Sequence, residues 1–307
     1  MPRLTQRLAL GAASIAATVL AATATGAQDT DPSAVQIEIR QLRPGLHLLG
    51  GVGCNVLAWT GPDGTVLVDA GKAEAAQQLL AAAARLAPQR VRFVVNTHWH
   101  PDHTGGNELL GRTGALVVSQ ENVRLRMSEP QYLSEYALQV PAAAAAALPV
   151  VTFDDGLTLN LNGDRLVLLH VPAAHTDGDG IAWWEEANVV HVGDVFYADG
   201  YPFLDTASGG SLAGLVSAIE TVLSRADSRT LVVPGHGPVA TRAELVAYRD
   251  MLVAVGRQVR ELAEQGRSLD EVLATEPTAP YDARYGKGGV SAERFVRLLF
   301  EGLSDRR

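Results

Sequence analysis

Four side chains that bind divalent metal ions well lie within six consecutive positions of this 307-residue chain. They are His98, His100, Asp102 and His103. Imidazole and carboxylate groups are the usual protein ligands of Zn²⁺ and of several other transition metals. Packing alone rarely gathers three imidazoles and a carboxylate in one short segment. The cluster therefore predicts a metal site and, with it, a metalloenzyme.

Three more candidate ligands, His175, Asp194 and His236, lie far from this cluster in the sequence. Each of them, like the cluster itself, follows shortly after an apolar segment that predicts a strand. The four predicted strands cover residues 91–96, 165–171, 188–192 and 230–233. We therefore expect four strands to deliver these side chains to one edge of a sheet.

The seven candidate ligands exceed the four that a single tetrahedral Zn²⁺ takes. Their number suits two metal ions roughly 3.5–4 Å apart that share a bridging oxygen. Imidazoles with one or two carboxylates favour Zn²⁺, and iron and manganese are the alternatives that such a set also accepts. The sequence thus predicts a centre of two zinc ions per chain.

The segments that must position these ligands alternate between predicted strands and helices. Further strands are predicted at 55–60, 65–69, 116–118, 158–161 and 181–184, and helices at 73–86, 121–128 and 211–225. The segment 91–96 is almost continuously apolar, as expected for a strand that is buried on both faces. This alternation favours one α/β domain with sheets between helices.

Two segments depart from the alternation. Residues 129–149, with an alanine run bounded by prolines, are interpreted as an insertion that is partly helical. Residues 241–307 are predicted to form a helical extension packed on the same domain, with capping boxes at Thr241 and Ser268 and a terminal helix at 291–303. The catalytic domain is then expected to cover residues 28–240.

Composition and charge limit the class of protein. Hydrophobic residues make up 47% of the chain, so it can bury a full core. The net charge of −9 argues against nucleic acid, which is bound through a basic surface, and against an anionic membrane surface. We expect a small-molecule substrate and no nucleic-acid partner.

Residues 1–27 have the pattern of a secretory signal peptide. Arg3 and Arg7 precede an apolar stretch at 8–20, and small residues lead to a predicted cleavage site after Ala27. An N-terminal membrane anchor is the alternative, although the apolar stretch is short for a spanning helix. We expect the mature protein to be periplasmic or secreted, without stable membrane association.

Several other polar residues are given structural interpretations. Cys54 is the only cysteine, so it cannot form an internal disulfide, and we expect a small buried residue rather than a nucleophile or metal ligand. His170 and His191 lie in or at the end of predicted strands and are interpreted as structural. Asp177 and Asp179 are interpreted as groups that shape a turn.

The order of these motifs resembles the metallo-β-lactamase superfamily. The resemblance is carried by His-x-His-x-Asp-His at 98–103, Val68-Asp69-Ala70-Gly71, the loop around His175, the pair Gly193-Asp194, and Gly235-His236-Gly237. Together these segments cover residues 37–236, nearly the whole mature chain. The resemblance implies a four-layer αββα sandwich of the metallo-β-lactamase type, with the metals at one edge.

The resemblance also implies a role for each candidate ligand. The first metal would be bound by His98, His100 and His175, and the second by Asp102, His103 and His236. Asp194 would bridge the two, as in hydrolases of the family that resemble glyoxalase II. Asp69 would orient a ligand through a hydrogen bond.

The implied reaction is attack by a hydroxide that bridges the two metals, because two dications lower the pKa of bound water. Asp102 would orient this hydroxide for attack on a polarised carbonyl. Trp99 is expected either to form a wall of the site or to pack under its loop. Tyr197 and Tyr201 follow Asp194, and each either donates a hydrogen bond to substrate or packs in the core.

The substrate is left open between several classes. An amide or ester-type bond is expected, with β-lactams a leading candidate because they act in the periplasm. Asp194 stands where one group of β-lactamases carries cysteine, and residues 195–203 hold no lysine or arginine for a substrate carboxylate. A thioesterase or lactonase of glyoxalase II type is therefore an alternative. An iron-dependent oxidoreductase like the persulfide dioxygenases is another, and a zinc-binding protein without turnover a third.

Overall fold

The computed structural model describes residues 35–133 and 137–304 of the chain. The predicted signal peptide, residues 1–27, lies outside the described residues. Within the described ranges, no helix is both long enough and apolar enough to cross a membrane. The described residues all belong to one compact unit.

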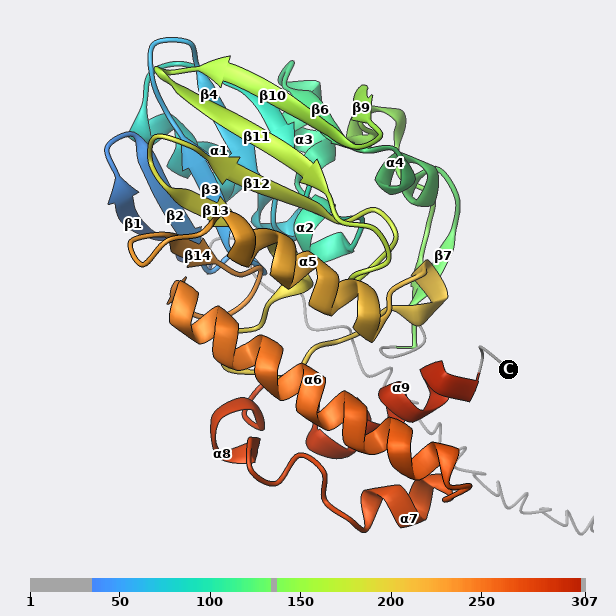
Figure 1. Cartoon of the computed structure of the whole chain (residues 1–307). Coiled ribbons are helices and arrows are strands. Elements are labelled where there is room, and N and C mark those ends of the chain that lie inside the picture. Colours follow the sequence, from blue (N-terminus) through green and yellow to red (C-terminus); the bar gives the residue numbers. More distant parts are fainter. Residues whose placement is uncertain (1–34, 134–136, 305–307) are drawn as a thin grey trace, which may run out of the picture. The chain divides into compact units, whose positions relative to one another are not determined.

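Two β-sheets hold most of the strands (Figure 1). The first sheet has the order β1 (Glu38–Arg43), β2 (Leu46–Gly50), β3 (Val56–Trp59), β4 (Thr65–Val68), β5 (Val91–Val95), β6 (Leu116–Gln120) and β9 (Val151–Phe153). The second has the order β10 (Gly156–Leu161), β11 (Asp164–His170), β12 (Gly180–Trp184), β13 (Val189–His191), β14 (Leu231–Val233) and β15 (Ala240–Thr241). Parallel pairing joins β4, β5, β6 and β9 in one sheet and β13 with β14 in the other.

The helices of the described residues are α1 (Ala76–Leu86), α2 (Pro101–Thr104), α3 (Asn107–Arg112), α4 (Glu121–Met127), α5 (Leu212–Arg225), α6 (Arg242–Glu264), α7 (Leu269–Leu273), α8 (Asp282–Tyr285) and α9 (Ala292–Ser304). The outer face of the first sheet packs against α1 and α3, and that of the second against α5, α6 and α9. Figure 1 shows α1 and α3 on the far side of the first sheet, and α5 and α6 beside the second. Short 3₁₀ turns are η2 (Ala73–Ala75), η4 (Ala145–Ala147), η5 (Gly193–Val195) and η6 (Thr206–Ser208).

The apolar side chains of each strand alternate between two cores, and this alternation builds the layers. In β3, Leu57 and Trp59 belong to the core between the sheets, whereas Val56 and Ala58 belong to the core under α1 and α3. A third core joins the outer face of the second sheet to α5, α6 and α9. The result is the predicted αββα sandwich, with the helical extension packed on one of its faces.

The segment 129–149 differs from its prediction. It was expected to be partly helical, but it contains the antiparallel strands β7 (Gln131–Leu133) and β8 (Leu138–Val140), with η4 as its only helical turn in the described residues. The alanine run is too short, and too close to its flanking prolines, to nucleate an α-helix. Residues 134–136, between the two strands, lie outside the described residues.

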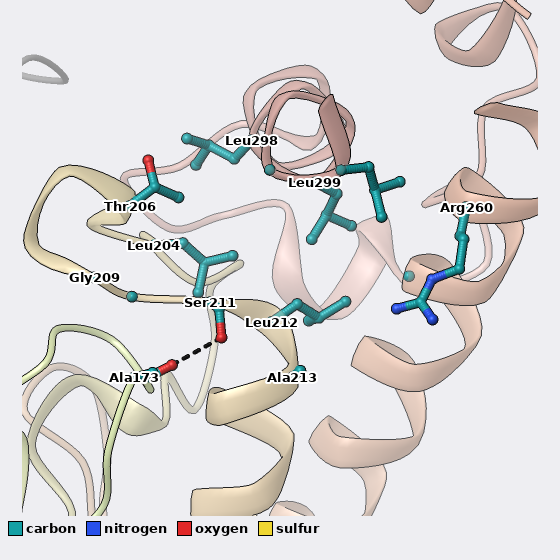
Figure 2. Close-up of a pocket in the computed structure, with 14 residues that line it drawn as sticks. Ala173, Leu204, Thr206, Gly209, Ser211, Leu212, Ala213, Arg260, Leu298 and Leu299 are labelled. Carbon is teal, nitrogen blue, oxygen red and sulfur yellow. Dashed lines mark hydrogen bonds between the residues drawn. The ribbon is translucent and has the colours of Figure 1, made fainter. Parts of the chain in front are cut away.

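The helical extension agrees with its sequence signals. Both predicted capping boxes are present, at Thr241 with Glu244 and at Ser268 with Glu271. The last helix, α9, occupies Ala292–Ser304, one residue from the predicted bounds at each end. A cavity of about 280 Å³ lies where α5, α6 and α9 meet, lined by leucines such as Leu212 and Leu299 and by Arg260 (Figure 2).

Candidate metal centre

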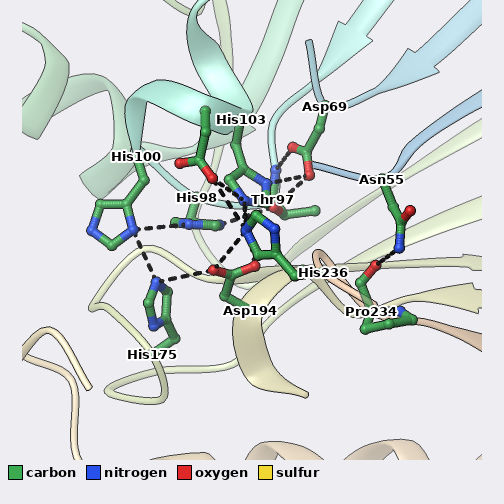
Figure 3. A network of polar contacts seen from close by, with 12 residues as sticks. Asn55, Asp69, Thr97, His98, His100, His103, His175, Asp194, Pro234 and His236 are labelled. Atoms are coloured by element: carbon green, nitrogen blue, oxygen red, sulfur yellow. Dashed lines mark hydrogen bonds and ion pairs between the residues drawn. The ribbon is translucent and has the colours of Figure 1, made fainter. Parts of the chain in front are cut away.

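The seven predicted ligands converge in the structure, but from two sheets rather than one. The 98–103 segment follows β5 of the first sheet, whereas His175, Asp194 and His236 follow β11, β13 and β14 of the second. The expectation of a single sheet edge was therefore wrong. Periodicity identifies a strand but does not say which sheet the strand joins, and the site lies where the ends of both sheets meet (Figure 3).

Three imidazole nitrogens meet at the first group of candidate ligands. Nδ1 of His100 lies 3.1 Å from Nε2 of His98 and 3.0 Å from Nε2 of His175. All three side chains are buried. Ligand nitrogens of a tetrahedral zinc are separated by roughly 3.3 Å, so the spacing fits one zinc ion.

The opposite ring nitrogen of each of these histidines has a partner that fixes the tautomer. Nε2 of His100 donates to Asp205 Oδ2 at 3.1 Å, and Nδ1 of His175 donates to the carbonyl of Phe203 at 2.8 Å. Nδ1 of His98 lies 3.0 Å from Thr97 Oγ1. This hydroxyl itself donates to a carboxylate of Asp69, so its oxygen accepts from His98. The three facing nitrogens therefore keep their lone pairs for a cation.

Asp102, His103 and His236 form the second group. Nε2 of His236 lies 3.1 Å from Asp102 Oδ2 and 3.4 Å from Nε2 of His103. Asp102 and His103 sit on α2, which begins with Pro101 at its first helical position. Proline is favoured there because its missing N–H would have no partner in the first turn.

Asp194 lies between the two groups. Its Oδ1 is 3.3 Å from Nε2 of His103, and its Oδ2 is 3.5 Å from Nε2 of His236 and 3.9 Å from Nε2 of His175. Oδ1 is buried and has no hydrogen-bond partner. A buried carboxylate oxygen without a partner is costly, and a metal ion would satisfy it.

Asp69, to which the resemblance assigns an orienting role, forms hydrogen bonds with the cluster. Its Oδ2 accepts from Nδ1 of His103 at 2.8 Å, and its Oδ1 accepts from the backbone N–H of Thr97 at 2.8 Å. Asp69 adopts a left-handed backbone conformation, with φ of 65°. Such strain in a residue other than glycine is concentrated at functional sites. Here it accompanies a carboxylate that bonds to both Thr97 and His103 of the segment after β5.

Gly235 allows the chain before His236 to approach the other ligands closely. A Cβ atom at this position would lie 2.0 Å from Asp194 Oδ1 and 2.9 Å from Cε1 of His103. Any side chain would therefore displace two candidate ligands. The glycine is needed for space, since its φ is not in the left-handed region.

The surroundings of the site lower the pKa of some of its histidines and raise the pKa of others. Burial lowers the pKa of His98 well below its usual value, and burial together with the neighbouring His100 lowers that of His175 to about 4. Burial also opposes the charged form of His103, but Cys54, Asp194 and Asp102 outweigh it and raise its pKa well above the usual value. The lowered pKa values favour the neutral form of His98 and of His175, which is the form that binds a metal ion.

The carboxylates of Asp102 and Asp194 favour positive charge at the second group. Asp194 raises the pKa of His236 to about 9, against the effect of burial. Burial raises the pKa of Asp102, but His103 and the hydrogen bond to His236 outweigh it and hold the pKa at about 2. A divalent cation between these residues would replace the protons that they otherwise attract. The donor groups could therefore hold divalent metal ions, and Asp194 lies between the first and the second group.

The three aromatic residues predicted as possible substrate contacts form hydrogen bonds within the protein. Trp99 is buried, and its Nε1 donates to Ser208 Oγ at 3.2 Å, so it packs under the loop and does not line the pocket at the ligands. Tyr197 donates to Asp194 Oδ2 at 2.6 Å, and its ring stacks on His236. Tyr201 donates to Asp282 Oδ1 at 2.6 Å, which directs its hydroxyl to the helical extension.

Two of the residues with structural interpretations, Cys54 and Asp179, are buried beside the candidate ligands. Cys54 is buried, with its thiol close to Asp69 and His103, and burial raises the pKa of the thiol to about 11. Asp179 accepts from the backbone N–H groups of His175 and Thr176 and so shapes the His175 loop. These bonds hold the loop that carries one candidate ligand.

Sequence reasoning missed Thr97, Phe203 and Asp205, which orient three of the histidines. Thr97 is adjacent to the cluster and could have been proposed from its position. The carbonyl of Phe203 and the carboxylate of Asp205 are separated from their histidines by 28 and 105 residues, and no local signal marks them.

A pocket of about 760 Å³ opens at the candidate ligands and is lined by His100, Asp102, Asp194 and His236. Lys72 also lines it, and it is the single lysine or arginine that does so within the described chain. Residues 195–203 contain no lysine or arginine, so Lys72 is the basic side chain at this pocket. Lys72 directly follows the Asp69-Ala70-Gly71 turn, so its place beside the cluster depends on the pairing of β4 with β5.

Comparisons with known proteins support the family and the fold. A family model, the metallo-beta-lactamase superfamily, matches residues 49–236, which include all seven candidate ligands. The chain belongs to the metallo-β-lactamase superfamily. A metallo-beta-lactamase from Pontibacter korlensis has a similar structure, with a TM-score of 0.57 at 23% identity over 71% of this chain and 99% of that one.

Similar curated proteins include enzymes with different substrates. The chain is 21% identical to metallo-beta-lactamase type 2 of Bacteroides fragilis over 53% of its length, and 24% identical to a linear primary-alkylsulfatase of Pseudomonas sp. over 73%. It spans 60% of the first relative and 50% of the second. A hydroxyacylglutathione hydrolase of Methylococcus capsulatus is 32% identical over 36% of each chain.

Proposed function

We propose that this protein is a binuclear zinc hydrolase that cleaves an amide or ester-type bond in a small molecule. One zinc would be held by His98, His100 and His175, and the other by Asp102, His103 and His236, with Asp194 bound to both. The observation that carries the proposal is that His98 Nε2 and His175 Nε2 both lie within 3.1 Å of His100 Nδ1, while the opposite nitrogen of every ring has a partner.

Bound zinc would supply Lewis-acid activation of the substrate carbonyl and of water at neutral pH. The protein's own residues hold the ligand nitrogens in place and keep their tautomers fixed. Asp102 stays ionised because of its neighbours, and it lines the pocket, where it can accept a hydrogen bond from water. Tyr197 positions the carboxylate of Asp194 through its 2.6 Å hydrogen bond, so its hydroxyl acts through Asp194.

β-Lactams are a leading candidate substrate class. One similar protein is named a metallo-beta-lactamase, and Lys72 offers the pocket a cation for a substrate carboxylate. A thioester or lactone is the second candidate, favoured by Asp194 between the two groups and by the similarity to a hydroxyacylglutathione hydrolase. An iron-dependent oxidoreductase like the persulfide dioxygenases is the alternative outside the hydrolases.

Metal analysis combined with a hydrolysis panel tests the proposal. The purified protein should contain about two zinc ions per chain and hydrolyse at least one of a β-lactam, a lactone, a thioester and a phosphodiester. One iron per chain with oxygen uptake would contradict the hydrolase and favour the oxidoreductase.

The variant Asp194→Ala tests the bridging role separately. It should bind less than two zinc ions per chain and lose most of its turnover, because a shared ligand of both metals is gone. Unchanged metal content and turnover would show that Asp194 does not bridge.

We also propose that the mature protein works in the periplasm or outside the cell, because residues 1–27 have the pattern of a signal peptide. Fractionation of cells that express the full chain tests this location. The N-terminal residue of the exported protein should be Gln28.

A further inference from the structure

The pocket at the candidate ligands has an apolar wall that the chemistry at the metals does not use. The hairpin β7–β8 contributes Leu133 and Leu138 to it, and the loop before α9 contributes Val290. The other lining residues from these two segments are Gly288 and Gly289. Neither segment places a charged side chain on the pocket within the described residues.

The two leucines form one surface because of the hairpin register. Leu133 and Leu138 are directly paired across the antiparallel strands, so they project from the same face. Tyr132 pairs with Gln139 on the opposite face and does not line this pocket. Leu133 is buried, whereas 44% of Leu138 is exposed. The hairpin therefore leaves an accessible apolar side chain at the pocket.

The apolar surface continues up to the candidate metal ligands. Phe203 lines the same pocket, and its ring stacks on His100 with a centroid separation of 5.9 Å. Val290 lies at the pocket because the helical extension contacts the loop after Asp194. The backbone N–H of Tyr201 donates to the carbonyl of Tyr285, and a Cβ on Gly288 would lie 2.7 Å from Cα of Gly200.

We infer that the substrate carries an alkyl or acyl chain of several carbons, which lies on the wall formed by Leu133, Leu138, Phe203 and Val290. The inference rests on the proposed function, because the bond to be cleaved must reach the candidate ligands. Burial of apolar surface supplies the affinity, and the chain's length is therefore a determinant of specificity. Leu138 is the main specificity residue because it has the most exposed apolar surface on the wall.

The binding of straight-chain carboxylates to the zinc-loaded protein tests the inference. Acetate, butyrate, hexanoate and octanoate share one head group, so differences in Kd measured by calorimetry report the chain. We expect Kd to fall roughly two- to fourfold for each added methylene, up to the value for full burial. Equal Kd values for acetate and octanoate would overturn the inference.

Two variants of the hairpin test whether Leu138 causes the dependence of Kd on chain length. Leu138→Ser should reduce the decrease in Kd to less than about 1.5-fold per methylene, because part of the apolar surface is lost. Tyr132→Ser is the matched control on the other face of the same hairpin and should retain the wild-type dependence. If Kd changed equally with chain length in both variants and in the wild type, the role of Leu138 would be overturned.

Hydrolysis of the 4-nitrophenyl esters of the same acids separates this inference from the proposed function. If no ester and no compound of the hydrolysis panel is cleaved but Kd still depends on chain length, the hydrolase is contradicted and the apolar wall stands. If esters are cleaved with the same kcat/KM for all chain lengths and Kd is also constant, the hydrolase stands and the wall is contradicted.

Discussion

At the scale of single residues, the site depends on the groups behind the candidate ligands as much as on the ligands themselves. Each histidine of the first group presents one nitrogen to the centre because the other nitrogen is bonded to Thr97, Asp205 or the carbonyl of Phe203. A rotated or flipped imidazole would aim an N–H at the metal position and weaken binding.

Removal of the carboxylate behind His100 should weaken metal binding. Asp205→Ala leaves Nε2 of His100 without its acceptor, so we expect the zinc affinity to fall roughly 10- to 100-fold. Competition with a chromophoric chelator measures this affinity. Asp270→Ala, at an exposed carboxylate on α7, is the control and should leave it unchanged. Equal affinities in both variants would contradict the orienting role of Asp205.

A methyl group at residue 235 should disturb the second group. Gly235→Ala would place Cβ 2.0 Å from Asp194 Oδ1, so Asp194 or the backbone must move. We expect the zinc content to fall from about two to about one per chain, measured by elemental analysis. Gly302→Ala, where no atom lies within 4 Å of the added Cβ, should keep the full content. Full zinc binding by Gly235→Ala would show that the site tolerates the methyl group.

At the scale of elements, strand ends and helix caps bring these residues into place. Five short connections after strands carry Asp69, the 98–103 cluster and the three distant ligands. Their polar side chains lie at the strand ends, where the backbone leaves the ladder and can turn toward the centre. The hairpin β7–β8 and the loop before α9 add the far side of the pocket.

The capping box at the start of α6 should contribute measurably to stability. Thr241 accepts a hydrogen bond from the backbone N–H of Glu244, and Glu244 accepts one from that of Thr241. Thr241→Ala should therefore lower the free energy of unfolding by about 1 kcal/mol. Urea denaturation measures the change. Thr221→Ala, at an exposed mid-helix threonine of α5, should change it by much less, and similar values for both would argue against the cap.

At the scale of the whole molecule, the two sheets and the extension enclose the site from different sides. The core between the sheets joins the two sheets, and the core on the outer face of the second sheet joins that sheet to α6 and α9. The extension also reaches the pocket through the bond between Tyr201 and Asp282. The helical segment after residue 241 is therefore part of the fold that shapes the pocket.

Metal binding should stabilise the whole chain. The ligands come from both sheets, and an unfolded chain cannot hold them together, so the metals bind the folded state selectively. Removal of zinc by a chelator should abolish hydrolysis and lower Tm by roughly 5–10 °C, measured by calorimetry. Restored zinc should reverse both changes. An unchanged Tm would mean that the metals do not link the two sheets energetically.

Much of this protein could be predicted from the sequence because the relevant signals are local. The 98–103 cluster, the Gly193-Asp194 pair and the caps at Thr241 and Ser268 are each encoded within a few residues. Apolar periodicity identified the main strands and helices to within one or two residues at most ends. These signals were sufficient for the α/β class and for the list of candidate ligands, and the resemblance to the metallo-β-lactamase superfamily implied the four-layer sandwich.

Only the tertiary structure decided which segments meet. Pairing of strands assigned the ligands to two sheets, and it brought Asp205 to His100 across 105 residues and Lys72 to the pocket. It also paired β7 with β8 and so placed Leu133 and Leu138 on the pocket. Contacts of this kind depend on the packing of distant segments, which leaves no periodic signal in either segment alone. The sequence by itself thus determined the set of candidate ligands, and the packing determined the pocket around them.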